Sequence, residues 1–203
     1  MLLLVGQGNP GPKYAKNRHN IGFRAVEAIS DRWRFGPWRK KFASECCEGE
    51  IDGVRALILK PQTFYNETGR AIGEAAGFYK IAPASVIVFH DEVDLAPGRM
   101  RMKTGGGAAG NNGVRSITGA IGAEFRRARL GVGHPGVKEM VQHWVLSDFA
   151  KADEAWVATL LDALASAAAF LVRGEDDRYQ AEVMRLAPAP KADPRGRPDP
   201  ENP

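Results

Sequence analysis

Apolar residues recur along this chain with two different periods, and the two periods alternate. Short apolar or alternating runs predict strands, and apolar residues three or four positions apart predict helices. The expected strands cover residues 1–7, 42–50, 54–60, 85–91, 99–104 and 126–133. The expected helices cover residues 19–33, 66–80, 114–121 and 153–173, with Asn66 as the N-cap of the second. Strands alternating with helices predict an α/β layered fold with a mixed sheet.

The C-terminal end differs in composition from the rest of the chain. From Pro188 onward, six of the last sixteen residues are proline and none is a large apolar residue, which predicts a disordered tail. A chain of 203 residues is long enough to bury one sizeable core. We therefore expect a single α/β domain over residues 1–187 and a proline-rich tail over residues 188–203.

The composition also limits the compartment. No apolar run approaches the roughly 20 residues that a membrane span needs, and the first residues lack the basic and apolar regions of a signal peptide. We therefore expect a cytoplasmic protein without membrane contact. The two cysteines, Cys46 and Cys47, are adjacent, which makes them a poor basis for a disulfide or a metal cage.

Positive charge gathers in one part of the chain. The formal net charge is +4, yet the stretch from Arg99 to Arg129 holds seven basic residues and one acid, Glu124, an excess of +6. Such a concentration is expected for a protein with a polyanionic partner such as nucleic acid. A solvated face balanced by distant acids is the alternative, and it applies equally to a second basic group over residues 32–41.

Polar residues follow several of the predicted strands. Asn9 follows the first strand, Asp91 ends another and the loop Gly105–Gly113 follows a third. Because ligands of open α/β sheets bind at the carboxyl ends of strands, we expect all three to open onto one edge. His19 is expected at a helix N-terminus, where the dipole disfavours imidazolium. A neutral histidine beside a carboxylate is a general base, and Asp91 is the candidate carboxylate.

No side-chain nucleophile is apparent, which favours direct attack by water and hence hydrolysis. Three asparagines, Asn9, Asn66 and Asn112, have the donors and acceptors to hold an amide-bearing substrate or to stabilise an oxyanion. A metal site is the rival interpretation of residues 90–94. Neighbours on a strand point to opposite faces, however, and the spacing matches no recognised ligand pattern. We therefore expect neither a metal nor a cofactor.

Six motifs in this order resemble those of the bacterial peptidyl-tRNA hydrolase family, over residues 1 to about 185. They are G-N-P-G at 8–11, Y-x-x-x-R-H-N at 14–20, K-P-x-T-F-x-N at 60–66, H-D-E-x-D at 90–94, K-x-G-G-G-x-x-G-x-N-G at 103–113 and R-x-G-x-G-H-P-G at 129–136. The resemblance implies a monomeric α/β domain of the phosphorylase/hydrolase-like type, with a twisted mixed sheet between helices.

The resemblance also implies an activity. It is the metal-independent, cofactor-free hydrolysis of the ester that joins a peptide, or an N-blocked amino acid, to the 3′-terminal ribose of tRNA, which frees the tRNA for reuse in translation. By position, His19 is the general base, Asp91 holds it in its basic form and Asn9 discriminates blocked from free aminoacyl-tRNA. The residues implied to line the substrate site are Tyr14, Phe64, Asn66 and Asn112, and those implied to bind the tRNA 5′-phosphate are Lys103 and Arg129.

Three residues depart from the family pattern. Tyr65 stands where many members carry Met, Asn111 where His is common, and Gln7 where a small apolar residue is usual. We expect these changes to alter the peptide-binding wall rather than the reaction. Two other functions stay open at this point. A non-catalytic RNA-binding module would bind tRNA without turnover, and a metal-dependent hydrolase on a similar fold would lose activity with a chelator.

Overall fold

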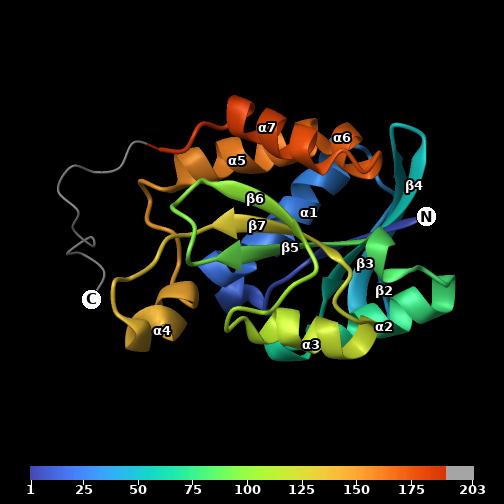
Figure 1. The fold of residues 1–203 in the computed structure, drawn as a ribbon, viewed down its shortest axis with the longest axis horizontal. Helices are drawn as coiled ribbons and strands as arrows, with labels where there is room; N and C mark the ends of the chain where they lie inside the picture. The colour runs from blue at the N-terminus through green and yellow to red at the C-terminus, as the bar shows by residue number, and fades with distance from the viewer. Residues whose placement is uncertain (191–203) are drawn as a thin grey trace.

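The computed structural model of the protein describes residues 1–190 (Figure 1). Seven strands form one sheet in the order β2-β3-β4-β1-β5-β7-β6. Their bounds are β1 Leu2–Gly6, β2 Arg39–Lys41, β3 Ser44–Ile51, β4 Val54–Pro61, β5 Val86–Glu92, β6 Met100–Thr104 and β7 Arg126–Gly131. The predicted α/β fold is confirmed. Most of the predicted proline-rich tail, from residue 191 on, lies outside the described residues.

The middle of the sheet is parallel and both ends are antiparallel. β1 pairs in parallel with β4 and β5, and β5 pairs in parallel with β7. β3 and β4 form the predicted hairpin around Asp52-Gly53, while β6 runs antiparallel to β7. The sequence did not predict β2, because its three residues are all basic and exposed and carry no apolar period.

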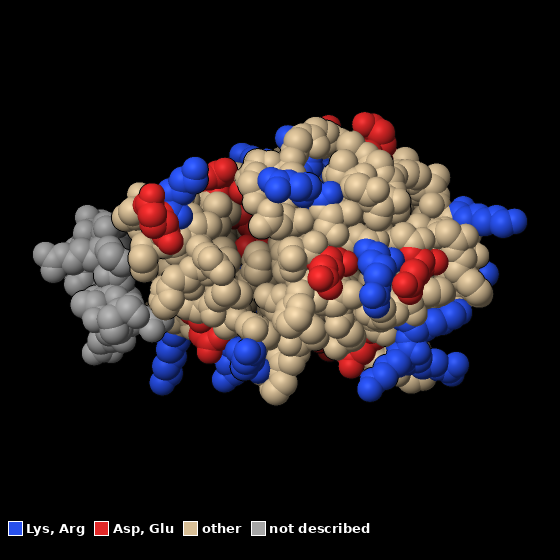
Figure 2. Space-filling model, turned by 90° about the horizontal axis from the view of Figure 1, so that it is seen from below, with Lys and Arg blue, Asp and Glu red and all other residues tan. Residues whose placement is uncertain are grey.

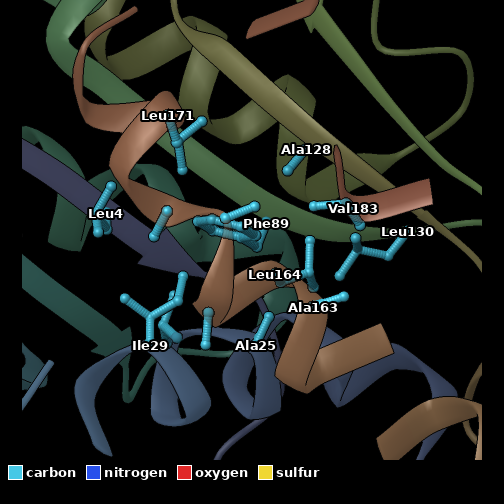
Figure 3. Close-up of a cluster of buried hydrophobic side chains, with 14 of the residues drawn as sticks. Leu4, Ala25, Ile29, Phe89, Ala128, Leu130, Ala163, Leu164, Leu171 and Val183 are labelled. Carbon is cyan, nitrogen blue, oxygen red and sulfur yellow. The ribbon is translucent and has the colours of Figure 1, made fainter. Parts of the chain in front are cut away.

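Helices cover both faces of the sheet (Figure 1). On one face lie α1 Ile21–Arg32, α5 Glu154–Ser166, α6 Ala168–Val172 and α7 Asp176–Leu186, and on the other lie α2 Thr68–Tyr79 and α3 Asn112–Ile121. The short α4, Val141–Val145, lies beyond the carboxyl end of β7. Figure 3 shows Leu4, Phe89 and Ala128 of the sheet packed against Ile29 of α1 and Leu164 of α5. Burial of this apolar surface on both faces holds the strands, and thus the strand ends, in fixed positions.

Two predicted helix details are wrong. Asn66 is not an N-cap, because a 3₁₀ turn over Tyr65–Glu67 precedes α2 and Glu67 takes the cap position. The single helix predicted over residues 153–173 is interrupted at Ala167, between α5 and α6. There the indole N–H of Trp33 donates to the carbonyl oxygen of Ala165 at 2.9 Å, which a continuous helix would pair with residue 169. Two further helices, α4 and α7, were not predicted.

A close approach between α1 and the sheet positions the first loop. A Cβ on Gly22 would lie 2.3 Å from the carbonyl oxygen of Phe89 and 2.6 Å from the backbone nitrogen of Gln7. Only glycine therefore allows the first turn of α1 to rest on the ends of β1 and β5. This contact holds the 3₁₀ turn Arg18–Asn20, which carries His19, against the carboxyl end of β5.

Candidate active site

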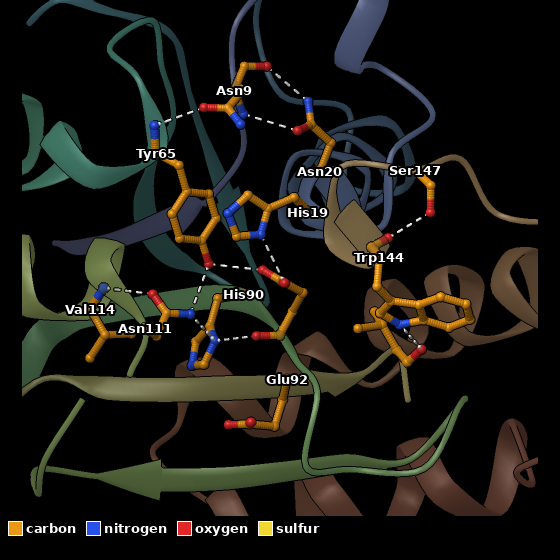
Figure 4. Close-up of polar contacts among 12 residues, drawn as sticks. Asn9, His19, Asn20, Tyr65, His90, Glu92, Asn111, Val114, Trp144 and Ser147 are labelled. Carbon is orange, nitrogen blue, oxygen red and sulfur yellow. Dashed lines mark hydrogen bonds and ion pairs between the residues drawn. The ribbon is translucent and has the colours of Figure 1, made fainter. Parts of the chain in front are cut away.

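His19 and Asp91 are in contact at the carboxyl edge of the sheet (Figure 4). The Nδ1 atom of His19 lies 2.8 Å from Oδ2 of Asp91. Asp91 is buried near the end of β5, whereas 17% of the His19 side chain is exposed. Because a carboxylate accepts the proton on Nδ1, the lone pair of the imidazole resides on Nε2. The structure thus brings together the two residues that the sequence paired, in the tautomer of a general base.

The surroundings of Asp91 favour its ionised form. Burial by itself would raise the pKa of Asp91, but the charge of protonated His19 and the hydrogen bonds from His19 and Tyr65 outweigh it, so the pKa lies below its usual value. The neighbouring His90 is also buried, and burial lowers the pKa of its imidazole. At neutral pH, Asp91 is therefore charged and the neighbouring His90 is neutral.

Tyr65 completes this arrangement. Its ring stacks on the imidazole of His19, with 3.5 Å between the ring centroids and 13° between the planes. Its hydroxyl donates to Oδ1 of Asp91 at 2.8 Å and accepts from Nδ2 of Asn111 at 3.0 Å. Burial and the nearby Asp91 raise the pKa of Tyr65 well above its usual value, so the hydroxyl stays a neutral donor. The sequence marked Tyr65 and Asn111 only as departures, not as members of the site.

Asn9 is held next to this group by its own amide. Its Oδ1 accepts from the backbone N–H of Tyr65 at 2.9 Å, and its backbone exchanges two hydrogen bonds with the Asn20 side chain. Within residues 1–190, Nδ2 of Asn9 makes no hydrogen bond. A cavity of about 330 Å³ lies beside Asn9 and is also lined by Asn20, Phe23 and Lys60. One N–H donor of fixed orientation is therefore available beside Tyr65, whereas the cavity itself is not lined by His19, Tyr65 or Asp91.

Three of the remaining predicted substrate residues, Phe64, Asn66 and Asn112, flank this group with their side chains at the surface. Phe64, which precedes Tyr65, is 57% exposed, and Asn66, which follows it, is exposed as well. Asn112 is exposed in the first turn of α3, directly after Asn111. Because Tyr65 and Asn111 are in contact, their sequence neighbours Asn66 and Asn112 have their backbones close to each other. Tyr14 is half-buried in a 3₁₀ turn of the first loop.

The basic stretch serves two purposes. Arg126 pairs with Asp176 of α7, and the buried Arg127 donates to the carbonyl oxygens of Gly105 and Gly107. Arg129 donates from Nε to Glu92 at 2.9 Å, while Lys103, opposite Arg127 in the β6–β7 register, is exposed. Arg126, Arg127 and Arg129 therefore have partners within the fold, whereas Arg99, Arg101, Lys103 and Arg115 are exposed and available to a polyanion.

The glycine-rich loop does not begin at the edge of the sheet that the sequence predicted. Because β6 is antiparallel to β7, residue 105 starts at the opposite edge, where its N–H bonds Phe125 at the start of β7. The loop then returns along the face covered by α3 (Figure 1). Only its far end, at Asn111, reaches the site, through the hydroxyl of Tyr65.

Arg18 had no predicted role. Its guanidinium is buried 3.7 Å above the Trp144 ring and donates to Oγ of Ser147 and the carbonyl oxygen of Asp148, at 2.8 and 2.6 Å. Next to it, Asn17 donates to the Asp148 carboxylate at 2.7 Å. These contacts hold the segment around α4 against the turn that carries His19. An arginine directly before a helix, where the dipole disfavours a cation, was the available signal.

In Figure 2 a hollow lies between the α4 end of the molecule and its main body. Atoms of Asp or Glu side chains lie in the hollow, and lysine and arginine side chains lie on both sides of it.

Among the described residues, no three His, Cys, Asp or Glu side chains gather as a metal site would require. No helix within residues 1–190 is long and apolar enough to cross a bilayer.

Comparisons with known proteins agree on one family. A family model described as peptidyl-tRNA hydrolase matches residues 3–191. The chain is 65% identical to the peptidyl-tRNA hydrolase of Phenylobacterium zucineum, covering 96% of this chain and 95% of that protein. It is 61% identical to that of Caulobacter vibrioides, with 96% and 97% covered. A crystal structure of the enzyme from Acinetobacter baumannii superposes with a TM-score of 0.87 at 37% identity, covering 93% and 97%.

Proposed function

Because the chain belongs to the peptidyl-tRNA hydrolase family, we propose that His19 and Asp91 carry out its reaction. The protein hydrolyses the ester between a peptide and the 3′-terminal ribose of tRNA. The observation that carries the assignment is the 2.8 Å contact from Nδ1 of His19 to Oδ2 of Asp91. This contact leaves Nε2 as the proton acceptor of a partly exposed ring.

The proposed reaction needs no covalent enzyme intermediate. Nε2 of His19 takes a proton from water as the water oxygen bonds to the ester carbonyl carbon. The tetrahedral intermediate then breaks its bond to the ribose oxygen, and His19 returns the proton to that oxygen. The products are a free carboxylic acid and a ribose hydroxyl. Asp91, ionised and hydrogen-bonded, stabilises the imidazolium formed between the two steps.

Substrate selection is assigned to Asn9 and the surrounding polar groups. Nδ2 of Asn9 can donate to the carbonyl oxygen of a blocked amino end, a group that free aminoacyl-tRNA lacks. Tyr14, Phe64, Asn66 and Asn112 are assigned to the substrate walls. Because a buried donor left without its acceptor is costly, free aminoacyl-tRNA is expected to bind less well.

The tRNA itself is assigned to basic residues of the paired strands β6 and β7. Lys103 and Arg129 bind the 5′-phosphate of the acceptor stem, while the 3′ end reaches the dyad. We assign the reaction to a monomer that acts in the cytoplasm without a metal or cofactor. Elution as a dimer at working concentration, or loss of activity with EDTA, would contradict this assignment.

The test compares the rates at which the wild type, His19→Ala and Asn9→Ala hydrolyse N-acetyl-aminoacyl-tRNA and free aminoacyl-tRNA. The wild type is expected to hydrolyse only the acetylated substrate at a high rate, and His19→Ala to bind tRNA with little turnover. Asn9→Ala is expected to narrow the difference between the two substrates. Full activity in His19→Ala refutes the mechanism, and equal wild-type rates refute the specificity. Exposed His134, changed to Ala, is the matched control.

A further inference from the structure

We propose that Tyr65 is a positioning residue for the His19–Asp91 dyad and that Asn111 fixes the direction of its hydroxyl. In this role the tyrosine extends the pH range of the reaction toward acid. The proposal rests on the assignment of His19 as the base. It concerns two residues whose side chains are not expected to contact the reacting ester.

The direction of the hydrogen bonds follows from one backbone N–H. Asn111 is the N-cap of α3, and its Oδ1 accepts from the N–H of Val114 at 2.9 Å. A backbone N–H can only donate, so the oxygen of the amide must face Val114 and the Nδ2 group must face Tyr65. Since Nδ2 donates to the phenol oxygen, the phenol proton is left for Oδ1 of Asp91. Figure 4 shows this series of contacts.

The tyrosine ring is also fixed in position. One side stacks on His19, and on the α3 side the backbone of Gly113 lies so close that an added Cβ would be 2.5 Å from Cε1 of Tyr65. The same Cβ would be 2.1 Å from Nε2 of Gln7. The imidazole and the first turn of α3 thus enclose the ring. The stacking limits the orientations of His19 while the hydroxyl holds the carboxylate to which His19 is bonded.

The hydroxyl also changes the charge that His19 experiences. A donor on Oδ1 stabilises the carboxylate and withdraws charge from Oδ2, so the carboxylate attracts an imidazolium less strongly. Removing the hydroxyl therefore strengthens the attraction between this carboxylate and a protonated His19. The other ionisable groups near the dyad are His90 and Glu92 of β5 and Arg127 of β7. Removal of the Tyr65 hydroxyl leaves all three side chains in the protein, and of the three only His90 lies near the Nδ2 group that loses its acceptor, at 3.5 Å.

The test removes the hydroxyl and follows the pH dependence. In Tyr65→Phe the ring stays, so we expect the acidic limb of kcat/KM and the NMR titration of the His19 imidazole to move up by about 0.5 pH unit. That shift corresponds to about a threefold loss of rate on the acidic side and little change on the plateau. Asn111→Ser, which keeps a capping oxygen but loses the donor to Tyr65, is expected to shift both midpoints the same way by less.

Two other tyrosines serve as matched controls. The hydroxyl of Tyr179 is buried and donates to the carbonyl oxygen of Leu164, and that of Tyr79 donates to the Glu48 carboxylate at the surface. Tyr179→Phe is expected to lower the Tm without moving either midpoint, and Tyr79→Phe to change neither. A lower Tm in Tyr65→Phe with unchanged midpoints, or a shift toward acid, would overturn the proposal.

The NMR titration also separates this proposal from the general-base assignment. If His19→Ala kept its activity, the assignment of the base would fail, yet the imidazole titration in Tyr65→Phe would still report the contact. If Tyr65→Phe did not fold, Asn111→Ser would decide. No shift in that variant would then refute the role of the hydroxyl.

Discussion

Replacing Asp91 by asparagine should disable the dyad through a conflict of hydrogen-bond directions. Two donors converge on this carboxylate, Nδ1–H of His19 at Oδ2 and the hydroxyl of Tyr65 at Oδ1, each at 2.8 Å. An amide offers one oxygen and one NH₂ group, so one of the two donors must change. Which one changes decides whether the enzyme keeps its base.

The surroundings favour the change at His19. If the NH₂ group of the new amide faced Tyr65, the phenol oxygen would accept from both that group and Asn111, and its own buried proton would have no acceptor, at a cost of about 1–3 kcal/mol. His19 avoids this cost by moving its proton to Nε2, which removes the lone pair that accepts from water. About 1–3 kcal/mol corresponds to roughly 5–150-fold, and loss of the carboxylate charge beside the imidazolium adds a comparable factor. We expect kcat to fall by about 10³-fold, and the corresponding substitution in Ser-His-Asp enzymes costs about 10⁴-fold.

The assay is single-turnover hydrolysis of N-acetyl-aminoacyl-tRNA by Asp91→Asn, with exposed Asp94→Asn as the matched control. A loss below about tenfold would refute the conflict described above, because it would mean that the base kept its tautomer. Acid unfolding offers a second readout. Since the pKa of folded Asp91 lies below its unfolded value of about 3.9, its ionised form stabilises the fold above about pH 4, and this contribution is lost as the pH falls through the folded pKa. Asp91→Asn should therefore flatten the fall in Tm below about pH 4.

Three further predictions concern the surroundings of the dyad. Gly113→Ala should press on the Tyr65 ring and lower activity about tenfold or more, whereas Gly119→Ala, in the same helix with open space around it, should leave activity unchanged and stabilise the helix by about 1 kcal/mol in thermal unfolding. Arg18→Met should cost about 2–4 kcal/mol in denaturant unfolding, because buried acceptors lose their donor, and Arg18→Lys should not restore it. Lys103→Ala and Arg129→Ala should each reduce the slope of log affinity for tRNA against log salt by about 1, and each should be less sensitive than the wild type to removal of the tRNA 5′-phosphate. An equal loss in wild type and variants would show that the phosphate binds elsewhere.

The elements that the sequence predicted correctly have clear hydrophobic patterns. β1, β4 and β5 are continuous apolar runs, and α1 carries its apolar residues on one face. β2 was missed because pairing with β3, and not burial, makes it a strand. The break between α5 and α6 depends on a donor from Trp33, which lies 132 residues away in sequence from Ala165. A local pattern contains no information about such a contact.

The same distinction applies to the site. His19 and Asp91 could be paired from the sequence because each has a distinctive chemistry and both lie where parallel strands end. Tyr65 could not, since a tyrosine in a helix-forming stretch is usually a packing residue, and its role depends on a partner 46 positions away, Asn111. Two of the three departures from the family pattern, Tyr65 and Asn111, are thus a bonded pair, and Tyr65 contacts the proposed base and its carboxylate directly. The expectation that they alter only the peptide-binding wall does not account for this geometry.

The reversed direction of β6 links the tRNA-binding region to the dyad. β6 carries exposed Lys103 toward the far edge of the sheet, and the glycine-rich loop must then travel back along the sheet before Asn111 can cap α3. Arg127 braces the start of that loop through the carbonyl oxygens of Gly105 and Gly107. The charge of Arg127 is thereby used inside the fold, whereas Lys103 on the neighbouring strand stays exposed. One loop therefore begins beside the proposed phosphate contact and ends at the hydroxyl that holds Asp91.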